Sequence, residues 1–175
     1  MSFIRGVFFS VVMSMGLGQA VASAEPATVP FVDVGKYMGT WYEIASFPKG
    51  FQFGCTATQA DYTLMENGNV HVENSCKLFF PGGLKYGVKG EARVVNAETN
   101  AQLKVKFYWA EGDYWVFDLA EDYSYALVGS PDFDSLWILS RARTLDQGVV
   151  DQLTAKATSL GFDASRLKFT KQPVD

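Results

Sequence analysis

A two-residue alternation of apolar or small side chains with mostly charged ones is the feature that most constrains the fold of this chain. It runs through residues 85–95 and again through residues 103–109. The apolar or small side chains of one parity are Tyr86, Val88, Gly90, Ala92, Val94, Leu103, Val105, Phe107 and Trp109. Because successive side chains of a strand point to opposite faces of a sheet, both segments are predicted to be strands with one dry face and one wet face.

Six further segments have the composition of strands and are separated by turn residues. They are residues 41–47, 56–64, 70–80, 114–119, 125–130 and 136–141. Asn67-Gly68, between the second and third of them, is the strongest short signal for a hairpin. Short strands at this spacing, joined by turns, are typical of an all-β sandwich or barrel.

A helical pattern follows the strands. Thr144 is expected to cap this helix, with Gln147 three residues later completing a capping box. One face of the helix carries Leu145, Val149, Leu153, Ala157 and Leu160. Gly161 is a suitable end, and residues 167–169 are expected to form a last short strand. Since the helix has a single apolar face, it is expected to pack against the outside of the sheet.

Two architectures fit this order of elements. An immunoglobulin-like sandwich is one of them. An open sheet of eight strands, however, leaves two edges that promote aggregation, and closure removes both. The hairpin-by-hairpin order and the single late helix therefore favour an all-β fold, an eight-stranded antiparallel up-and-down β-barrel with one C-terminal α-helix packed outside. A barrel of eight strands holds either its own side chains or one small ligand.

The first residues have the pattern of a secretory signal peptide. Arg5 supplies a positive charge, residues 7–17 are apolar, and Ala22-Ser23-Ala24 is a suitable cleavage site. We therefore expect residues 1–24 to be removed and residues 25–175 to form one domain, with an uncleaved membrane anchor as the alternative. No cysteine lies near the cleavage point. Lipid attachment to an N-terminal cysteine is therefore not expected, and the predicted location is the periplasm.

Export would place Cys55 and Cys76 in an oxidising compartment, where a disulfide persists. The two cysteines flank the predicted hairpin, which brings them near each other. A turn at Asn67-Gly68 would nevertheless set Cys55 opposite a residue near Phe80. The predicted disulfide therefore requires a β-bulge or a flexible approach to the first strand of the hairpin.

The composition argues against several classes of protein. A net charge of −4 and a pI near 5.0 do not suit a nucleic-acid-binding protein, which normally carries a basic stripe. His71 is the one histidine, and two cysteines cannot build a four-thiolate zinc site. No metal, cofactor or catalytic residue is therefore predicted.

Three short motifs carry a resemblance to a known family. Gly39-Thr40-Trp41 in residues 34–44, Asp122-Tyr123, and residues 136–141 ending in Arg141 resemble, in this order, the three lipocalin motifs. The chain is similar in particular to the bacterial lipocalin (Blc-type) group, which also includes relatives of apolipoprotein D. The resemblance covers nearly all of the predicted domain.

The resemblance implies a barrel with an apolar calyx that binds fatty acids, lysophospholipids or similar amphiphiles. It also implies structural roles for Gly39, Trp41 and Arg141, with the Arg141 guanidinium lying over the Trp41 indole at the closed base of the barrel. Many bacterial members of the group are outer-membrane lipoproteins, and the expected absence of a lipid anchor here is a departure from them.

Ligand contacts are expected on the inward parity of each strand. If Trp41 faces the base, Glu43 and Ala45 point inward as well, which leaves Tyr42 and Ile44 outside beneath the helix. The predicted ligand-binding residues are Glu43, Ala45, Tyr62, Val72, Tyr86, Val88, Val105, Phe107, Trp109, Tyr114, Val116 and Trp137.

Two choices in this set depend on further assumptions. Residues 114–117 are all apolar, so Tyr114 and Val116 are preferred as inward positions although Trp115 and Phe117 would serve equally well. Trp115, Phe117 and Phe133 would then form an exposed surface for membrane docking or dimerisation, or be scattered surface aromatics. Small inward residues such as Gly90 are expected to leave the interior hollow.

The resulting functional prediction is a periplasmic carrier or scavenger of lipids without enzymatic activity. Its expected partner is a small hydrophobic ligand such as a fatty acid or lysophospholipid, and a membrane surface and a second copy of the chain are further candidates. An isomerase-type lipocalin enzyme is the alternative from another class, and it requires a free, reactive thiolate. A purely structural plug is a third possibility, and it requires a filled interior.

Overall fold

The computed structural model describes residues 25–108 and 110–173. Its elements, in chain order, are α1 (Val34–Tyr37), β1 (Gly39–Ser46), η1 (Gly50–Gln52), β2 (Cys55–Leu64), β3 (Val70–Leu78), β4 (Lys85–Val94), β5 (Gln102–Phe107), β6 (Glu111–Leu119), β7 (Tyr125–Gly129), β8 (Leu136–Ser140), α2 (Gln147–Leu160), η2 (Ala164–Arg166) and β9 (Lys168–Phe169). The predicted signal peptide, residues 1–24, and Trp109 lie outside the described residues.

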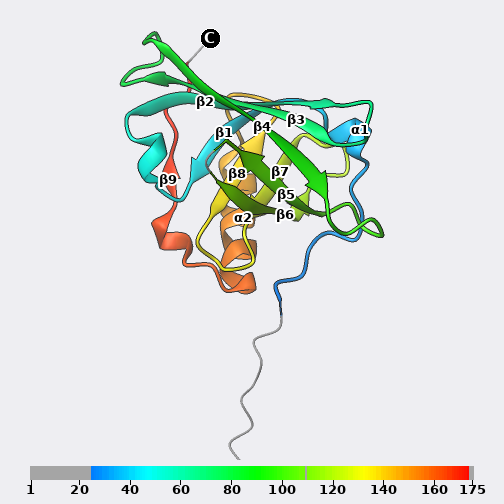
Figure 1. The fold of residues 1–175 in the computed structure, drawn as a ribbon. Helices are drawn as coiled ribbons and strands as arrows, with labels where there is room; N and C mark the ends of the chain where they lie inside the picture. Colours follow the sequence, from blue (N-terminus) through cyan, green and yellow to red (C-terminus); the bar gives the residue numbers. More distant parts are fainter. Residues whose placement is uncertain (1–24, 109, 174–175) are drawn as a thin grey trace, which may run out of the picture.

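The eight main strands form a closed antiparallel barrel (Figure 1). Each strand from β1 to β8 pairs with the next, and β8 pairs with β1, as in Tyr42 opposite Ser140. The short strand β9 adds to the end of β1 through Ala45 and Phe169. The predicted eight-stranded up-and-down barrel is therefore confirmed, and the sandwich alternative is wrong.

The helix α2 packs on the outside of the barrel, as predicted. It buries Val150, Leu153 and Ala157 in an apolar cluster with barrel residues such as Ile138. The predicted cap at Thr144 is wrong. The helix begins after Asp146, whose carboxylate accepts a hydrogen bond from the Gly148 amide at 2.8 Å.

The helix α2 begins two residues later than predicted because two local interactions favour Asp146 as its cap. An ionised carboxylate satisfies a free amide of the first turn and suits the positive end of the helix dipole. Leu145, just before the cap, packs against the same cluster as Val150. This apolar contact fixes the angle at which the chain enters the helix.

A β-bulge in β1 reverses one predicted side-chain direction. The pairing with β8 shifts between Glu43 and Ala45, so Ile44 is the extra residue. Glu43 keeps the inward direction, whereas Ala45 is fully buried in the outer cluster beneath α2. The prediction that Ala45 faces the interior is therefore wrong, because one inserted residue flips the parity of everything after it.

A second bulge, in β2, brings the two cysteines together. The pairing of β2 with β3 shifts between Thr56 and Gln59, directly opposite Cys76. Ala57 within the bulge has a φ of 50° and donates its amide to the Lys171 carbonyl at 2.7 Å. Cys55 and Cys76 are joined by a disulfide, with 5.5 Å between their Cα atoms. The disulfide and the bulge that it requires are both as predicted.

We expect the disulfide to contribute about 3 kcal/mol to the free energy of unfolding, because it closes a chain segment of 21 residues. A double variant, Cys55→Ser with Cys76→Ser, should lose this amount in urea denaturation at neutral pH. Wild-type protein kept in dithiothreitol is the matched control and should unfold like the variant. Equal stability of the oxidised protein and the double variant would contradict this prediction.

The two ends of the barrel differ. At one end, α1 lies across the barrel beside the β2–β3, β4–β5 and β6–β7 connections, and at the other lies the β1–β2 segment with η1 (Figure 1). We call these the closed end and the open end. No helix in the described part of the chain has the length and apolar character that crossing a membrane requires.

Candidate ligand cavity

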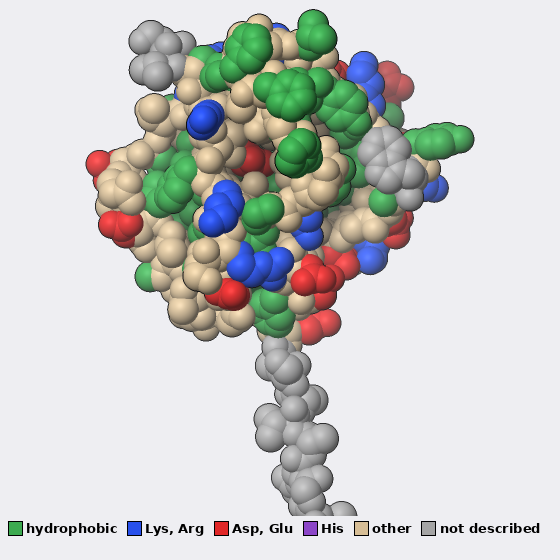
Figure 2. Space-filling view, turned by 90° about the vertical axis from the view of Figure 1, so that its left-hand side faces the viewer, with side chains coloured by type: hydrophobic (Ala, Val, Ile, Leu, Met, Phe, Trp, Pro, Cys, Tyr) green, Lys and Arg blue, Asp and Glu red, His purple; other side chains and the backbone are tan. Residues whose placement is uncertain are grey.

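The barrel encloses a cavity of about 650 Å³ that runs from the closed end to the loops of the open end. Its lining includes Val32 and Met38 beside α1 at one end, and Phe51 and Asp132 in open-end loops at the other. A volume of this size lies in the range of small-molecule sites, about 300–1,000 Å³. The open end with its central hollow faces the viewer in Figure 2.

Most of the predicted ligand-binding residues are brought together at this cavity. Those on its wall are Glu43, Tyr62, Val72, Tyr86, Val88, Val105, Phe107, Tyr114, Val116 and Trp137. Ala45 is on the opposite side of the sheet, for the reason given above. The ligand-binding role of these residues stays a prediction, whereas their position on the wall is a structural finding.

Strand β6 separates the cavity from the outer core. Tyr114 and Val116 point into the cavity, as chosen from the sequence. Trp115 and Phe117 lie in the outer cluster, where the Phe117 ring is 5.3 Å from that of Phe162. The predicted exposed surface of Trp115, Phe117 and Phe133 is therefore wrong. The first two are buried and Phe133 packs against the same cluster, because α2 and the segment after it cover this side of the barrel.

Gly90 contributes to the cavity differently from what its size suggests. A Cβ atom at this position would lie 2.7 Å from Cδ1 of Phe107 and 2.6 Å from the Lys106 carbonyl oxygen. Gly90 therefore makes room for the Phe107 ring of the neighbouring strand rather than for a ligand. Ala92, two residues along the same strand, is a small residue on the cavity wall itself.

The closed end is sealed by Trp41 and Arg141. Trp41 is fully buried, and the Arg141 guanidinium carbon lies 3.9 Å from the centre of its ring. Arg141 also donates to the Thr40 carbonyl at 2.8 Å and the Lys36 carbonyl at 3.0 Å. Gly39 has a φ of +94°, and a Cβ there would approach Arg141 Nη1 to 3.4 Å. The contact implied by the sequence motifs is therefore present.

Three tyrosines meet just inside this seal. The Tyr37 hydroxyl is 2.8 Å from that of Tyr114, and Tyr62 donates to Tyr114 at 3.3 Å. All three line the cavity among apolar neighbours such as Val116. Burial raises the pKa of each phenol above its ordinary value, that of Tyr62 to about 12. The three groups are therefore neutral at physiological pH.

These pKa shifts predict a loss of stability in alkali. Above about pH 10 the tyrosines ionise in the unfolded chain but stay protonated in the folded one. The unfolded chain then binds fewer protons, so the free energy of unfolding falls as the pH rises, by about 1.4 kcal/mol per pH unit for each such tyrosine. For Tyr62 the fall should run from about pH 10 to about pH 12.

Urea denaturation at a series of pH values from about 8 to about 12 measures this loss. This range extends to both sides of the ordinary tyrosine pKa. Tyr62→Phe should show a shallower fall than the wild type, since it has one titrating phenol fewer. Identical slopes for Tyr62→Phe and the wild type would contradict the assignment.

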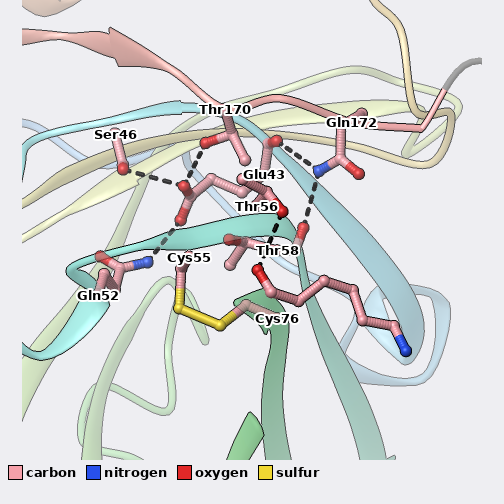
Figure 3. Close-up of a disulfide and its surroundings, with 10 residues drawn as sticks. Glu43, Ser46, Gln52, Cys55, Thr56, Thr58, Cys76, Thr170 and Gln172 are labelled. Atoms are coloured by element: carbon pink, nitrogen blue, oxygen red, sulfur yellow. Dashed lines mark hydrogen bonds between the residues drawn. A yellow bond between two sulfur atoms is a disulfide. The ribbon is translucent and has the colours of Figure 1, made fainter. Parts of the chain in front are cut away.

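A polar section of wall lies beside the disulfide (Figure 3). The buried Glu43 carboxylate accepts hydrogen bonds from Ser46 at 3.1 Å, Gln52 at 2.9 Å and the Thr170 hydroxyl. The Gln172 amide donates to the backbone carbonyls of Glu43 at 2.8 Å and Thr58 at 2.9 Å. The C-terminal segment thus ties β1 to β2 and holds Glu43 in place.

Sequence reasoning missed several lining residues. They include Tyr37 and Met38 at the closed end, and Gln52, Thr58, Asn74 and Ser75 on the polar section. Tyr37 belongs to a helix of four residues, which is too short to show a periodic pattern. Thr58 follows directly on Ala57 within the β2 bulge, where alternation cannot be read.

Exposed apolar side chains gather around the open end. Figure 2 shows them over the upper part of this face. We call this set the mouth rim, and it consists of Phe51, Phe53, Phe79, Phe80, Leu84 and Tyr108. Phe53 and Leu84 are among the most exposed, with 85% and 80% of their surface in solvent.

The disulfide bears on the alternative prediction, that of a cysteine-dependent isomerase. Both cysteines of the sequence are consumed by it. The oxidised protein therefore lacks the thiolate that a cysteine-dependent isomerase requires. Within residues 25–108 and 110–173, no group of three or more His, Cys, Asp or Glu side chains is placed to bind a metal ion.

Comparison with known proteins agrees with this architecture. The family profile of the lipocalin-like domain matches residues 32–172. The chain is a member of the lipocalin family. This lipocalin is 39% identical over 158 residues to temperature-induced lipocalin-1 of Arabidopsis thaliana, covering 85% of this chain and 83% of the relative.

Other relatives come from bacteria and animals. The outer membrane lipoprotein Blc of Escherichia coli K12 is 41% identical to this lipocalin over 143 residues, covering 81% of this chain and 80% of Blc. Mouse apolipoprotein D is 40% identical over 150 residues, covering 80% and 77%. The predicted likeness to the Blc and apolipoprotein D group is thus confirmed.

A solved structure supports the fold independently. Insecticyanin from the tobacco hornworm Manduca sexta superposes with a TM-score of 0.66 over 87% of this lipocalin and 86% of that chain. The two sequences are 20% identical, so this likeness concerns the fold alone.

Proposed function

We propose that this protein binds a fatty acid, lysophospholipid or similar small amphiphile in the barrel cavity and carries or scavenges it in the periplasm, without catalysing a reaction. The observation that carries the proposal is the cavity of about 650 Å³, lined mainly by apolar side chains and reaching the open end. The proposal includes removal of residues 1–24 by signal peptidase on export.

The energy of chain burial is sufficient for useful affinity. Each methylene group removed from water contributes about 0.8 kcal/mol, so about ten of them contribute roughly 8 kcal/mol. Loss of translational freedom and ordering of the chain cost several kcal/mol. A longer chain that buries about fifteen methylenes contributes roughly 12 kcal/mol, which leaves about 8 kcal/mol, the equivalent of micromolar binding, after a cost of about 4 kcal/mol.

Titration with a fluorescent fatty-acid probe, followed by displacement with unlabelled oleate or lysophosphatidylcholine, tests the binding. We expect saturable binding at one site per chain and complete displacement by at least one of the two lipids. Mass spectrometry of the N-terminus after expression with export should find Glu25 as the first residue. The absence of saturable probe binding would contradict the carrier proposal.

We further propose that the mouth rim touches a membrane surface when ligand is exchanged. Exposed aromatic side chains around the opening of an apolar cavity form a patch of the kind that marks interaction sites. Bilayer contact would let an acyl chain pass into the cavity without crossing water.

Sedimentation with phosphatidylglycerol–phosphatidylethanolamine vesicles tests this contact. The double variant Phe53→Ser with Phe80→Ser should bind the vesicles more weakly than the wild type but bind the soluble probe equally well. Phe169→Ser, which removes an exposed aromatic of β9 outside the mouth rim, is the matched control. Loss of a wild-type dimer in the double variant, with unchanged vesicle binding, would instead assign the rim to self-association.

A further inference from the structure

The hydroxyl groups of the tyrosine cluster leave one proton without an acceptor. Tyr37, Tyr62 and Tyr114 carry three hydroxyl protons, and the cluster contains two hydrogen bonds. Each hydrogen bond uses one proton, whichever way the Tyr37–Tyr114 pair is oriented. No other described side chain or backbone group bonds to these hydroxyls. One hydroxyl proton at the closed end of the cavity therefore has no acceptor among the described protein groups.

The surroundings of the cluster make this donor costly. The Tyr37 ring packs on Trp41, 4.9 Å between ring centres, and Tyr62 and Tyr114 pack against the inner apolar core. A polar group buried without a partner costs more than an ordinary hydrogen bond contributes. Burial also raises the pKa of the three phenols, so they stay donors at neutral pH.

The location of the donor determines which end of a bound ligand can reach it. All three tyrosines line the cavity at the end away from the mouth rim. The group that satisfies the spare proton is therefore on the leading end of the ligand, the end inserted first. A saturated methyl end would leave the proton unsatisfied.

We propose that the tyrosine cluster is a binding site for one neutral acceptor oxygen, a carbonyl or hydroxyl, carried on the leading end of the apolar ligand. This inference rests on the proposed function and specifies its ligand class. A carboxylate fits less well, because its two charged oxygens need more donors than one spare proton supplies when they are buried. The site therefore favours long-chain ketones, alcohols or acyl chains oxygenated near their far end.

The test compares 2-decanone with decane, two chains that differ mainly in one oxygen, in displacement of the fluorescent fatty-acid probe. The variant replaces all three tyrosines by phenylalanine (Tyr37→Phe, Tyr62→Phe and Tyr114→Phe together). A single replacement would not suffice, because the two remaining hydroxyls would still hold at least one spare proton. Removing all partners of a buried polar cluster while keeping its shape is nearly neutral for folding.

We expect the triple variant to bind 2-decanone about fivefold to tenfold more weakly than the wild type, and decane within about twofold of it. The carbonyl stretching frequency of bound 2-decanone should also be higher in the variant, because the hydrogen bond is lost. Tyr125→Phe, which changes a tyrosine of the outer apolar cluster and not of the cavity wall, is the matched control and should change neither affinity.

Three outcomes are distinguishable. Selective weakening of 2-decanone in the triple variant supports the inference. Equal changes for both ligands, or no change, with the wild type still binding the fatty-acid probe, overturn the inference but leave the proposed function intact. Failure of the wild type to bind the probe at all overturns the proposed function, and the inference with it.

Discussion

Replacing Trp137 with aspartate will weaken binding of the fluorescent fatty-acid probe by about a hundredfold. Trp137 lies on β8 opposite Ser46 and forms part of the cavity wall. An acyl chain in the cavity would remove water from the new carboxylate without giving it a partner, at a cost of several kcal/mol. A loss of about 2.7 kcal/mol corresponds to a hundredfold change in the dissociation constant.

A matched control separates this effect from general charge repulsion. Val95→Asp adds the same charge at an exposed position outside the cavity and should bind the probe like the wild type. Phe107→Asp, on β5, should behave like Trp137→Asp. Circular dichroism and urea denaturation check that each variant is folded. Unchanged affinity in both cavity variants would mean that the acyl chain binds elsewhere.

Replacing Trp41 with alanine will lower the free energy of unfolding by about 3–5 kcal/mol, the usual range for removing a large buried aromatic. Trp41 has no solvent-exposed surface, and its indole N–H donates to the Tyr37 carbonyl at 2.9 Å. The variant would leave a hole between α1 and the barrel, and Arg141 would lose the ring beneath its guanidinium. Urea denaturation at about pH 7 measures this loss of free energy of unfolding.

A double-mutant cycle with Arg141→Met isolates the contact between the two residues. Trp41→Leu removes the aromatic ring but keeps an apolar side chain in its place, so its cost should depend on whether the guanidinium is present. We expect a coupling energy of about 1 kcal/mol, because Arg141 remains partly exposed to solvent. A coupling near zero would show that the stacking of Arg141 on Trp41 does not contribute to the seal.

The barrel could be predicted from sequence because several strands have one wet face. In β4 and β5 the lysines alternate with apolar residues, and this fixes both the strand and its inward side. In β6 the same logic fails. Tyr114 and Trp115 are both apolar because one faces the cavity and the other faces α2. The prediction that Tyr114 and not Trp115 faces the cavity is correct, but the alternation of residue types does not determine it.

Irregular backbone limited what could be predicted of the cavity. The inward direction predicted for Ala45 is wrong because a bulge at Ile44 leaves no trace in the pattern of residue types. Tyr37 reaches the cavity from a four-residue helix before the first strand, where no periodicity is available. The tyrosine cluster combines this helix with β2 and β6, so its three hydroxyls are adjacent only in the folded chain.

The most direct test of the central claim is a crystal structure with a fatty acid brominated at its terminal carbon, because the anomalous signal of bromine marks the chain independently of its shape. Our account predicts one strong bromine peak inside the barrel, within the cavity bounded by Trp137, Val105 and the tyrosine cluster. A cavity filled by the protein's own side chains, or a bromine peak only on the outer surface, would contradict it.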